Sequence, residues 1–297
     1  MSLKILYVVY FLFKEKEAPL VFKIILIILG VVTALLTIIV VFKSFFGFFE
    51  MARVEFITKK QFFTHFYINR KTLPKAYKPI LEQEFLFYKK LNPLEQKNFD
   101  HRIQYFINNW EFIGKDVEIT TKMKVLIAAT ATKLTFGFRE YKIDVVEKIV
   151  IYEKAYFSSI NNQLHKGEFN LRFNALVFSW EDFEKGYKIE NDNINLGVHE
   201  CIHAMHFTFL KSRRYSTSAA IFLDSFQELT SLIEKDNRLK NKIINSGYFR
   251  NYAFENQFEF ISVLVENFIE TPSEFKSQFP IIYLKVKEML NFNFAGY

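Results

Sequence analysis

The chain has 297 residues, half of them hydrophobic, so it has ample material for one large domain or two small ones. Its net charge of +7 is modest and its lysines are interspersed with glutamates, which does not indicate binding to nucleic acid. A single cysteine, Cys201, excludes an intrachain disulfide. We expect it to be a small buried apolar residue rather than a metal ligand.

An uncharged apolar stretch lies near the amino terminus, between Lys23 and Lys43. As an α-helix it would measure about 28 Å, close to the hydrocarbon thickness of a bilayer. A cleaved signal peptide fits less well because the stretch is long, begins late and has no small-residue cleavage site after it. We therefore predict a membrane anchor over residues 1–54 with one transmembrane helix at about 20–42. A buried core helix is the alternative, and the flanking lysines do not decide the orientation.

Residues 55–297 are typical of a globular domain, without repeats or flexible linkers. Asn92 followed by Pro93 indicates a helix cap and a first-turn proline. Helical patterns outnumber strand patterns, so we predict an α+β fold that is mostly helical with a small mixed sheet. In chain order the predicted elements are helices at 79–91, 93–110 and 121–134, strands at 148–152 and 174–179, and helices at 195–210, 218–236 and 255–270.

Residues 199–203 read His-Glu-Cys-Ile-His, within the predicted helix at 195–210. Residues four apart lie on one face of a helix, so both imidazoles can bind one zinc ion. Glu200 lies beside the first histidine, where its carboxylate can take a proton from a water that the zinc activates. This is the arrangement of the zinc metalloproteases. The alternative is an ordinary helix that carries two histidines.

The third ligand is not determined by spacing. A catalytic zinc needs three protein ligands and one open position. His206 follows His203 by three residues, and as a ligand it would need a tight turn off the helix, so we expect it behind the site or in the core. The acidic candidates after His203 are Asp224, Glu228, Glu255, Glu259, Glu266 and Glu270.

The strand at 174–179 precedes the motif by about twenty residues and has two interpretations. At the edge of the sheet, it could pair with an extended substrate and hold it beside the metal. It could equally be an ordinary internal strand.

The carboxy-terminal part, from Tyr252-Ala253 through Glu259-Phe260 and Glu266 to Thr271-Pro272, resembles the signature of the Mlc titration factor A (MtfA) peptidases. The resemblance covers about residues 75–290. It includes Phe112-Ile113-Gly114-Lys115, Ile127-Ala128-Ala129-Thr130-Ala131, Ile149-Val150-Ile151-Tyr152, Ser179-Trp180 and Pro280-Ile281-Ile282-Tyr283.

This resemblance implies a zincin-like metalloprotease domain in which Glu259 is the third zinc ligand and Glu266 supports the site. It also implies a role for Tyr252, whose phenol could donate to the oxyanion of an intermediate; a buried structural tyrosine is the alternative. The chain departs from the family at His206, where the family has Asp, and at Arg250-Asn251, where it has Asp-Ala. The family is otherwise soluble and cytoplasmic, so the membrane helix is an addition.

The sequence therefore predicts a membrane-anchored, single-pass zinc peptidase with its catalytic domain on the cytoplasmic side. Zn²⁺ is bound by His199, His203 and Glu259, Glu200 is the general base, and Tyr252 assists. The expected partner is a peptide or protein substrate, with no nucleic acid. One alternative is a regulatory binding protein that sequesters a transcriptional regulator and has a secondary metal site. Another is a structural zinc site with four protein ligands.

Overall fold

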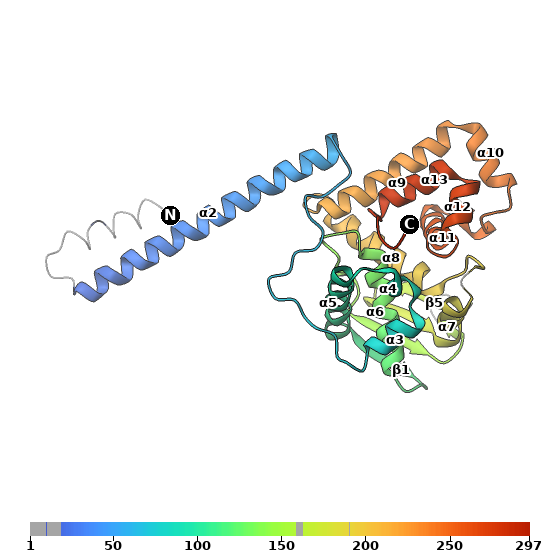
Figure 1. The fold of residues 1–297 in the computed structure, drawn as a ribbon, viewed down its shortest axis with the longest axis horizontal. Coiled ribbons are helices and arrows are strands. Elements are labelled where there is room, and N and C mark those ends of the chain that lie inside the picture. Colours follow the sequence, from blue (N-terminus) through green and yellow to red (C-terminus); the bar gives the residue numbers. More distant parts are fainter. Residues whose placement is uncertain (1–9, 11–18, 159–162, 190) are drawn as a thin grey trace. The chain divides into compact units, whose positions relative to one another are not determined.

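The computed structural model describes residue 10 and residues 19–158, 163–189 and 191–297 (Figure 1). The chain divides into two compact units, Met1–Ala52 and Arg53–Tyr297. Helix α2 (Leu20–Phe56) has 37 residues and contains the predicted span. Among the described residues it is the one helix long and apolar enough to cross a membrane. None of its most apolar window is buried, so the structure gives no support to a core helix.

The second unit contains a four-stranded mixed sheet in the order β1-β2-β6-β5. Strands β1 (Glu111–Lys115), β2 (Lys148–Tyr152) and β6 (Ala175–Ser179) are parallel, and β5 (Gly167–Asn170) pairs with β6 in the antiparallel direction. The strands predicted at 148–152 and 174–179 are confirmed. Because β6 lies between β2 and β5, it is internal, so its interpretation as an edge strand was wrong. A two-stranded sheet joins β3 (Tyr156–Ser158) and β4 (Gln163–His165).

Helices make up most of the second unit. The longer ones confirm the predicted helices: α5 (Pro93–Asn109), α6 (Thr121–Thr135), α8 (Leu196–Ser212), α9 (Thr217–Lys235) and α11 (Gln257–Glu270). The sequence did not predict the shorter α7 (Trp180–Lys188), α10 (Asn237–Asn245), η1 (Asn251–Phe254), α12 (Pro272–Gln278) and α13 (Pro280–Met289).

The single helix predicted at 79–91 was wrong, because the chain forms α3 (Lys78–Glu84) and α4 (Leu86–Lys90) with a break at Phe85. Phe85 leaves the helical conformation with φ −118° and ψ 87°. Its buried ring packs against Phe99 and Tyr187. An apolar pattern alone does not show that one ring must turn inward between two short helices.

Helix α8, which carries the motif, lies in the middle of the second unit. It packs against α6 and α11 and against strands β5 and β6. Figure 1 shows it between the sheet and the carboxy-terminal helices α9 to α13. Helix α6 is buried on nearly all sides and contributes Ala128, Ala129 and Ala131, whose small side chains let neighbouring helices approach closely. The packing of α8 on several elements gives its histidines a rigid support.

Candidate metal centre

The structure brings His199 and His203 of α8 together with Glu259 of α11, and their ligand atoms lie within 4.8 Å of one another. Glu259 Oε2 lies 3.0 Å from His199 Nε2 and 3.5 Å from His203 Nε2, and the two Nε2 atoms are 3.1 Å apart. Zinc–ligand bonds of about 2.0–2.2 Å in a tetrahedron place neighbouring ligand atoms about 3.3–3.6 Å apart. The three atoms are within a few tenths of an ångström of that arrangement, so the residues fit one such ion.

Helix caps position both ligand-bearing helices. The side chain of Asn195 accepts a hydrogen bond from Val198 N and begins α8 just before the motif. The side chain of Asn256 accepts from Phe258 N and Glu259 N, which places Glu259 in the first turn of α11. Each cap fixes where its helix begins, and therefore which residues face the other helix.

The imidazoles are oriented by partners on α11. His199 Nδ1 lies 2.7 Å from Glu266 Oε1, and since a carboxylate only accepts, Nδ1 carries the proton and donates. His203 Nδ1 lies 3.4 Å from Ser262 Oγ. A donor at Nδ1 leaves the lone pair of Nε2 directed at the centre of the cluster, as metal binding requires.

Glu266 is itself held from several sides. Its side chain is buried, at 1% exposure. Oε1 also accepts from Arg250 Nη2 at 2.5 Å, and Oε2 accepts from Asn195 N at 2.8 Å. The carboxylate therefore joins His199 to the amino end of the helix that carries it. Arg250 occupies the outer side of this contact, with its side chain 32% exposed.

The charges of the site favour a cation at its centre. Burial lowers the pKa of His199, but the carboxylates of Glu259 and Glu266 outweigh it and raise the value to about 10. Burial raises the pKa of Glu259, but His199 and His203 outweigh it and lower the value to about 2. Without a metal, an extra proton on an imidazole offsets the negative charge of the carboxylates. A divalent ion would replace that proton, as metal sites commonly do.

Glu200 lies beside the cluster and not within it. Its carboxylate Oε2 accepts a hydrogen bond from Phe169 N of β5 at 2.8 Å. Burial raises the pKa of Glu200 above its ordinary value. A raised pKa suits a group that must take up a proton and then release it.

Strand β5 is the edge strand that the sequence did not reveal, because it is four residues long and half polar. Its close approach to α8 depends on Gly167. A Cβ atom there would lie 2.6 Å from Leu196 Cδ1 and 3.1 Å from Glu200 Cγ. The missing side chain therefore allows the backbone of β5 to reach the Glu200 carboxylate.

Tyr252 of η1 faces the cluster of His199, His203 and Glu259, with its ring 5.7 Å from the ring of His199. Because Tyr252 is 41% exposed, it is not the buried structural tyrosine that was the alternative. Partial burial and the charges of Glu259 and Glu200 raise its pKa, so the phenol keeps its proton and can donate a hydrogen bond. His199, Glu200, Arg250 and Tyr252 together line a cleft of about 450 Å³ whose other wall includes residues of β4, β5 and α7.

The remaining candidates lie elsewhere. His206 is in the core, where its ring packs against Phe222, Phe226 and Phe258, and burial lowers its pKa to about 4. Glu228 pairs with Lys59 and Lys285 instead of facing the histidines. Cys201 is buried and outside the cluster, as predicted.

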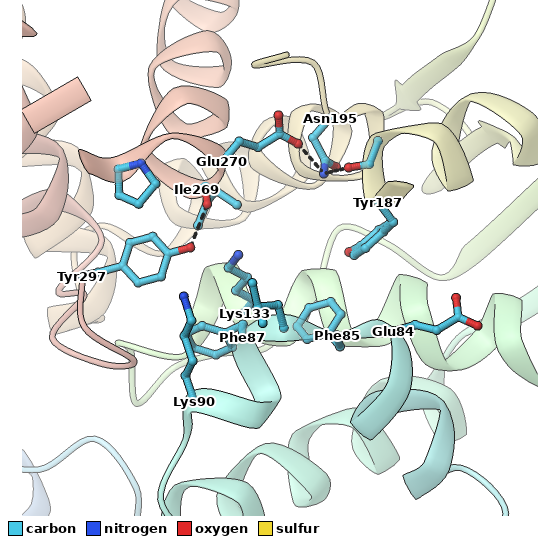
Figure 2. Close-up of a pocket in the computed structure, with 13 residues that line it drawn as sticks. Glu84, Phe85, Phe87, Lys90, Lys133, Tyr187, Asn195, Ile269, Glu270 and Tyr297 are labelled. Carbon is cyan, nitrogen blue, oxygen red and sulfur yellow. Dashed lines mark hydrogen bonds between the residues drawn. The ribbon is translucent and has the colours of Figure 1, made fainter. Parts of the chain in front are cut away.

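A smaller cavity lies on the other side of Asn195 (Figure 2). There Asn195 Nδ2 donates to Gly186 O at 2.9 Å and to Glu270 Oε1 at 3.0 Å. Burial raises the pKa of Glu270 to about 7. Glu270, a sequence candidate for the metal, thus contacts the cap of α8 and is not part of the metal cluster.

Comparison with known proteins agrees with the geometry. The family model described as Glucose-regulated metallo-peptidase M90 matches residues 58–290, which is most of the chain. An uncharacterized protein of Synechocystis sp. is 25% identical over 235 residues, which cover 72% of this chain and 82% of the relative. The family match includes all three residues of the metal cluster and leaves out helix α2.

Proposed function

The chain belongs to the glucose-regulated metallo-peptidase M90 family, and on this premise we propose that it is a zinc-dependent peptidase with a zincin-like catalytic domain. The cluster of His199, His203 and Glu259 beside a cleft is the observation that carries the proposal. Two imidazole nitrogens and one carboxylate oxygen are a common ligand set of catalytic zinc. Three protein ligands leave one position open, unlike a structural site with four.

The proposed mechanism assigns a role to each neighbouring group. Bound zinc supplies a Lewis acid that polarises the scissile carbonyl and makes water more acidic. Glu200 takes the proton of the attacking water and delivers it to the leaving amine, while Phe169 N–H holds the carboxylate in place. The phenolic O–H of Tyr252 donates a hydrogen bond to the oxygen that becomes negative. Glu266 and Ser262 keep the two imidazoles oriented.

The outer edge of β5 is the proposed binding surface for the substrate. Phe169 N on this edge already donates to Glu200, so the substrate would pair with the remaining outer backbone groups. β5 ends the described sheet beyond β6, so its outer backbone groups face away from the sheet. An extended peptide that added to this edge would pass beside Glu200. The substrate would then be a peptide, or an unfolded or flexible part of a protein. The MtfA-like signature supports the same proposal.

Helix α2 is proposed as a single transmembrane anchor, with the catalytic domain in the cytoplasm. The length and apolar composition of α2 support the transmembrane span. The MtfA family, which the chain resembles, is cytoplasmic, and this supports a cytoplasmic catalytic domain. A regulatory binding protein without peptidase activity is not favoured, because binding a metal does not require Glu200 beside the ligands.

The proposal is tested by Glu200→Gln in the full-length protein. The variant should keep its zinc, measured by metal analysis, and lose hydrolysis of an unfolded protein by roughly a hundredfold or more. Glu255→Gln is the matched control, because Glu255 is an exposed glutamate next to the cleft residues of η1, and it should retain full activity. A zinc-loaded Glu200→Gln protein with normal activity would exclude the proposed role.

A further inference from the structure

Residues 56–78, which we call the basic aromatic segment, run from the last residue of α2 to the first residue of α3 and carry an unusual charge. The segment contains no Asp or Glu. It contains Lys59, Lys60, Arg70, Lys71, Lys75 and Lys78. It also contains four phenylalanines and two isoleucines, Phe56, Ile57, Phe62, Phe63, Phe66 and Ile68.

The polarity of this segment is inverted relative to an ordinary surface loop. Gln61 is buried, and its Nε2 donates to Thr217 Oγ1 at 2.7 Å and to Ser218 Oγ at 3.0 Å. Its Oε1 accepts from Arg139 N at 3.0 Å. The next residue, Phe62, is 51% exposed. A polar side chain therefore points into the domain, and an apolar one points out.

A second set of inward hydrogen bonds gives the same inverted polarity further along the segment. The fully buried Arg102 donates from Nε to Tyr67 Oη at 2.6 Å and from Nη2 to Thr64 O at 3.4 Å. With these groups held inward, Phe66 is 69% exposed and Ile68 is 95% exposed. The outward direction of the apolar side chains is thus set by specific hydrogen bonds inside the domain.

Exposed phenylalanines and isoleucines among cations match the surface of a membrane. Apolar side chains of this kind insert at the boundary between headgroups and acyl chains, and lysine and arginine bind anionic headgroups. Lys59 pairs with Glu228, and Lys78 pairs with Glu82. The cations that could contact headgroups are therefore Lys60, Arg70, Lys71 and Lys75. The segment begins at the last residue of α2, about 14 residues after the predicted span ends near residue 42, so the chain tethers it to the same bilayer.

We propose that the basic aromatic segment lies on the surface of an anionic bilayer, the membrane that α2 crosses, and holds the catalytic domain against it. The inference rests on the anchor proposed above for the identity of the membrane. Phe66 and Ile68 insert at the interface, and Arg70 and Lys71 contact phosphate groups. The peptidase would then act on substrates at or near the membrane surface.

The test adds one tryptophan at a time to the full-length protein, which is placed in vesicles that contain brominated lipid. Ile68→Trp reports the segment and Leu29→Trp reports α2. Phe173→Trp is the control, because it lies in the turn between β5 and β6 and is 55% exposed. The wild-type protein gives the background of Trp110 and Trp180. In vesicles rich in phosphatidylglycerol, we expect the brominated lipid to quench the fluorescence of Ile68→Trp and of Leu29→Trp. The fluorescence of Phe173→Trp should not be quenched.

Charge reversal gives the second arm. Arg70→Glu with Lys71→Glu should reduce the quenching of Ile68→Trp, whereas Lys148→Glu with Lys154→Glu should not. Quenching at Leu29→Trp without quenching at Ile68→Trp would overturn the inference and leave the anchor intact. If neither Leu29→Trp nor Ile68→Trp were quenched, the anchor and the inference would both be rejected. Blue-shifted but unquenched emission at Ile68→Trp would mean that a protein covers the segment, which also overturns the inference.

Discussion

Glu266 connects the candidate metal site to the start of α8. Its two oxygens contact His199, Arg250 and Asn195, so one buried carboxylate orients an imidazole and holds the start of α8. Groups that orient metal-binding histidines commonly affect metal affinity by 10- to 100-fold. We expect the contact between Glu266 and His199 to affect zinc affinity by a factor of that size.

For this reason Glu266→Gln should weaken zinc binding by about 10- to 100-fold, since the amide cannot accept from His199 and Arg250 as the carboxylate does. Competition with a chelator of known affinity measures the change. Glu270→Gln is the control, because it lies on the same helix and can still accept from Asn195. Equal zinc affinity in the Glu266→Gln and wild-type proteins would mean that the contact does not orient His199.

Glu270 predicts a pH dependence of stability. Burial raises the pKa of this carboxyl from 4.5 to about 7, so the folded state favours its protonated form. Stability is therefore lost as pH rises from about 4.5 to about 7. Glu270→Gln, neutral at every pH, should have a higher Tm than the wild type at pH 8 and a similar Tm near pH 4.5. A Tm difference of the same size at both values, or a lower Tm at pH 8, would contradict this assignment.

Sequence reasoning named the candidate residues that are neighbours in the chain or that lie in a resembling signature. His199, Glu200 and His203 share one helix, so spacing alone predicts their common face. Spacing did not distinguish Glu259 from Glu228, because that choice depends on how α9 and α11 pack. Phe169 N could not be found, because a backbone amide has no signature in the sequence.

At the scale of elements, the site depends on the distance between β5 and α8. The longer helices and the two central strands were predictable, because burial gives them a clear apolar pattern. Strand β5 and the break at Phe85 were not, since short elements are determined by their tertiary contacts. Gly167 is the point where this distance can be altered.

Gly167→Ala should therefore lower peptidase activity without removing the metal ligands. Its Cβ would meet Leu196 and Glu200, so β5 must move and the Glu200 carboxylate must shift. A displacement of about 1 Å can cost about a hundredfold in rate. We expect a loss of kcat approaching that size with zinc content unchanged. Gly47→Ala, where a Cβ meets nothing within 4 Å, is the control. Normal kcat in Gly167→Ala would show that the close approach is not required.

At the scale of the molecule, one chain combines a helix suited to a bilayer with a catalytic domain from a metallopeptidase family. Hydropathy predicted the helix, but the charge pattern around it did not give the orientation. The exposed basic aromatic segment was not predicted, because its inverted polarity appears only once Gln61 and Arg102 are seen to point inward.

Removal of residues 1–50 is expected to give a zinc-binding domain that is released from the bilayer core, since the described contacts of the cluster lie within Arg53–Tyr297. The full-length chain should fractionate with membranes. Protease added outside intact inner membranes should leave the catalytic domain uncut. A full-length chain in the soluble fraction would reject the anchor, and cleavage from outside would reject the orientation alone.

The central claim is that one metal ion, held by His199, His203 and Glu259, makes the protein a peptidase. Its most direct test is to titrate zinc into the metal-free, full-length protein while hydrolysis of an unfolded protein is measured. Activity should rise linearly and reach its plateau at one zinc per chain, and Glu259→Ala should show no such rise at the same zinc concentrations. Activity that is independent of zinc, or a Glu259→Ala protein activated at the same stoichiometry, would contradict the account.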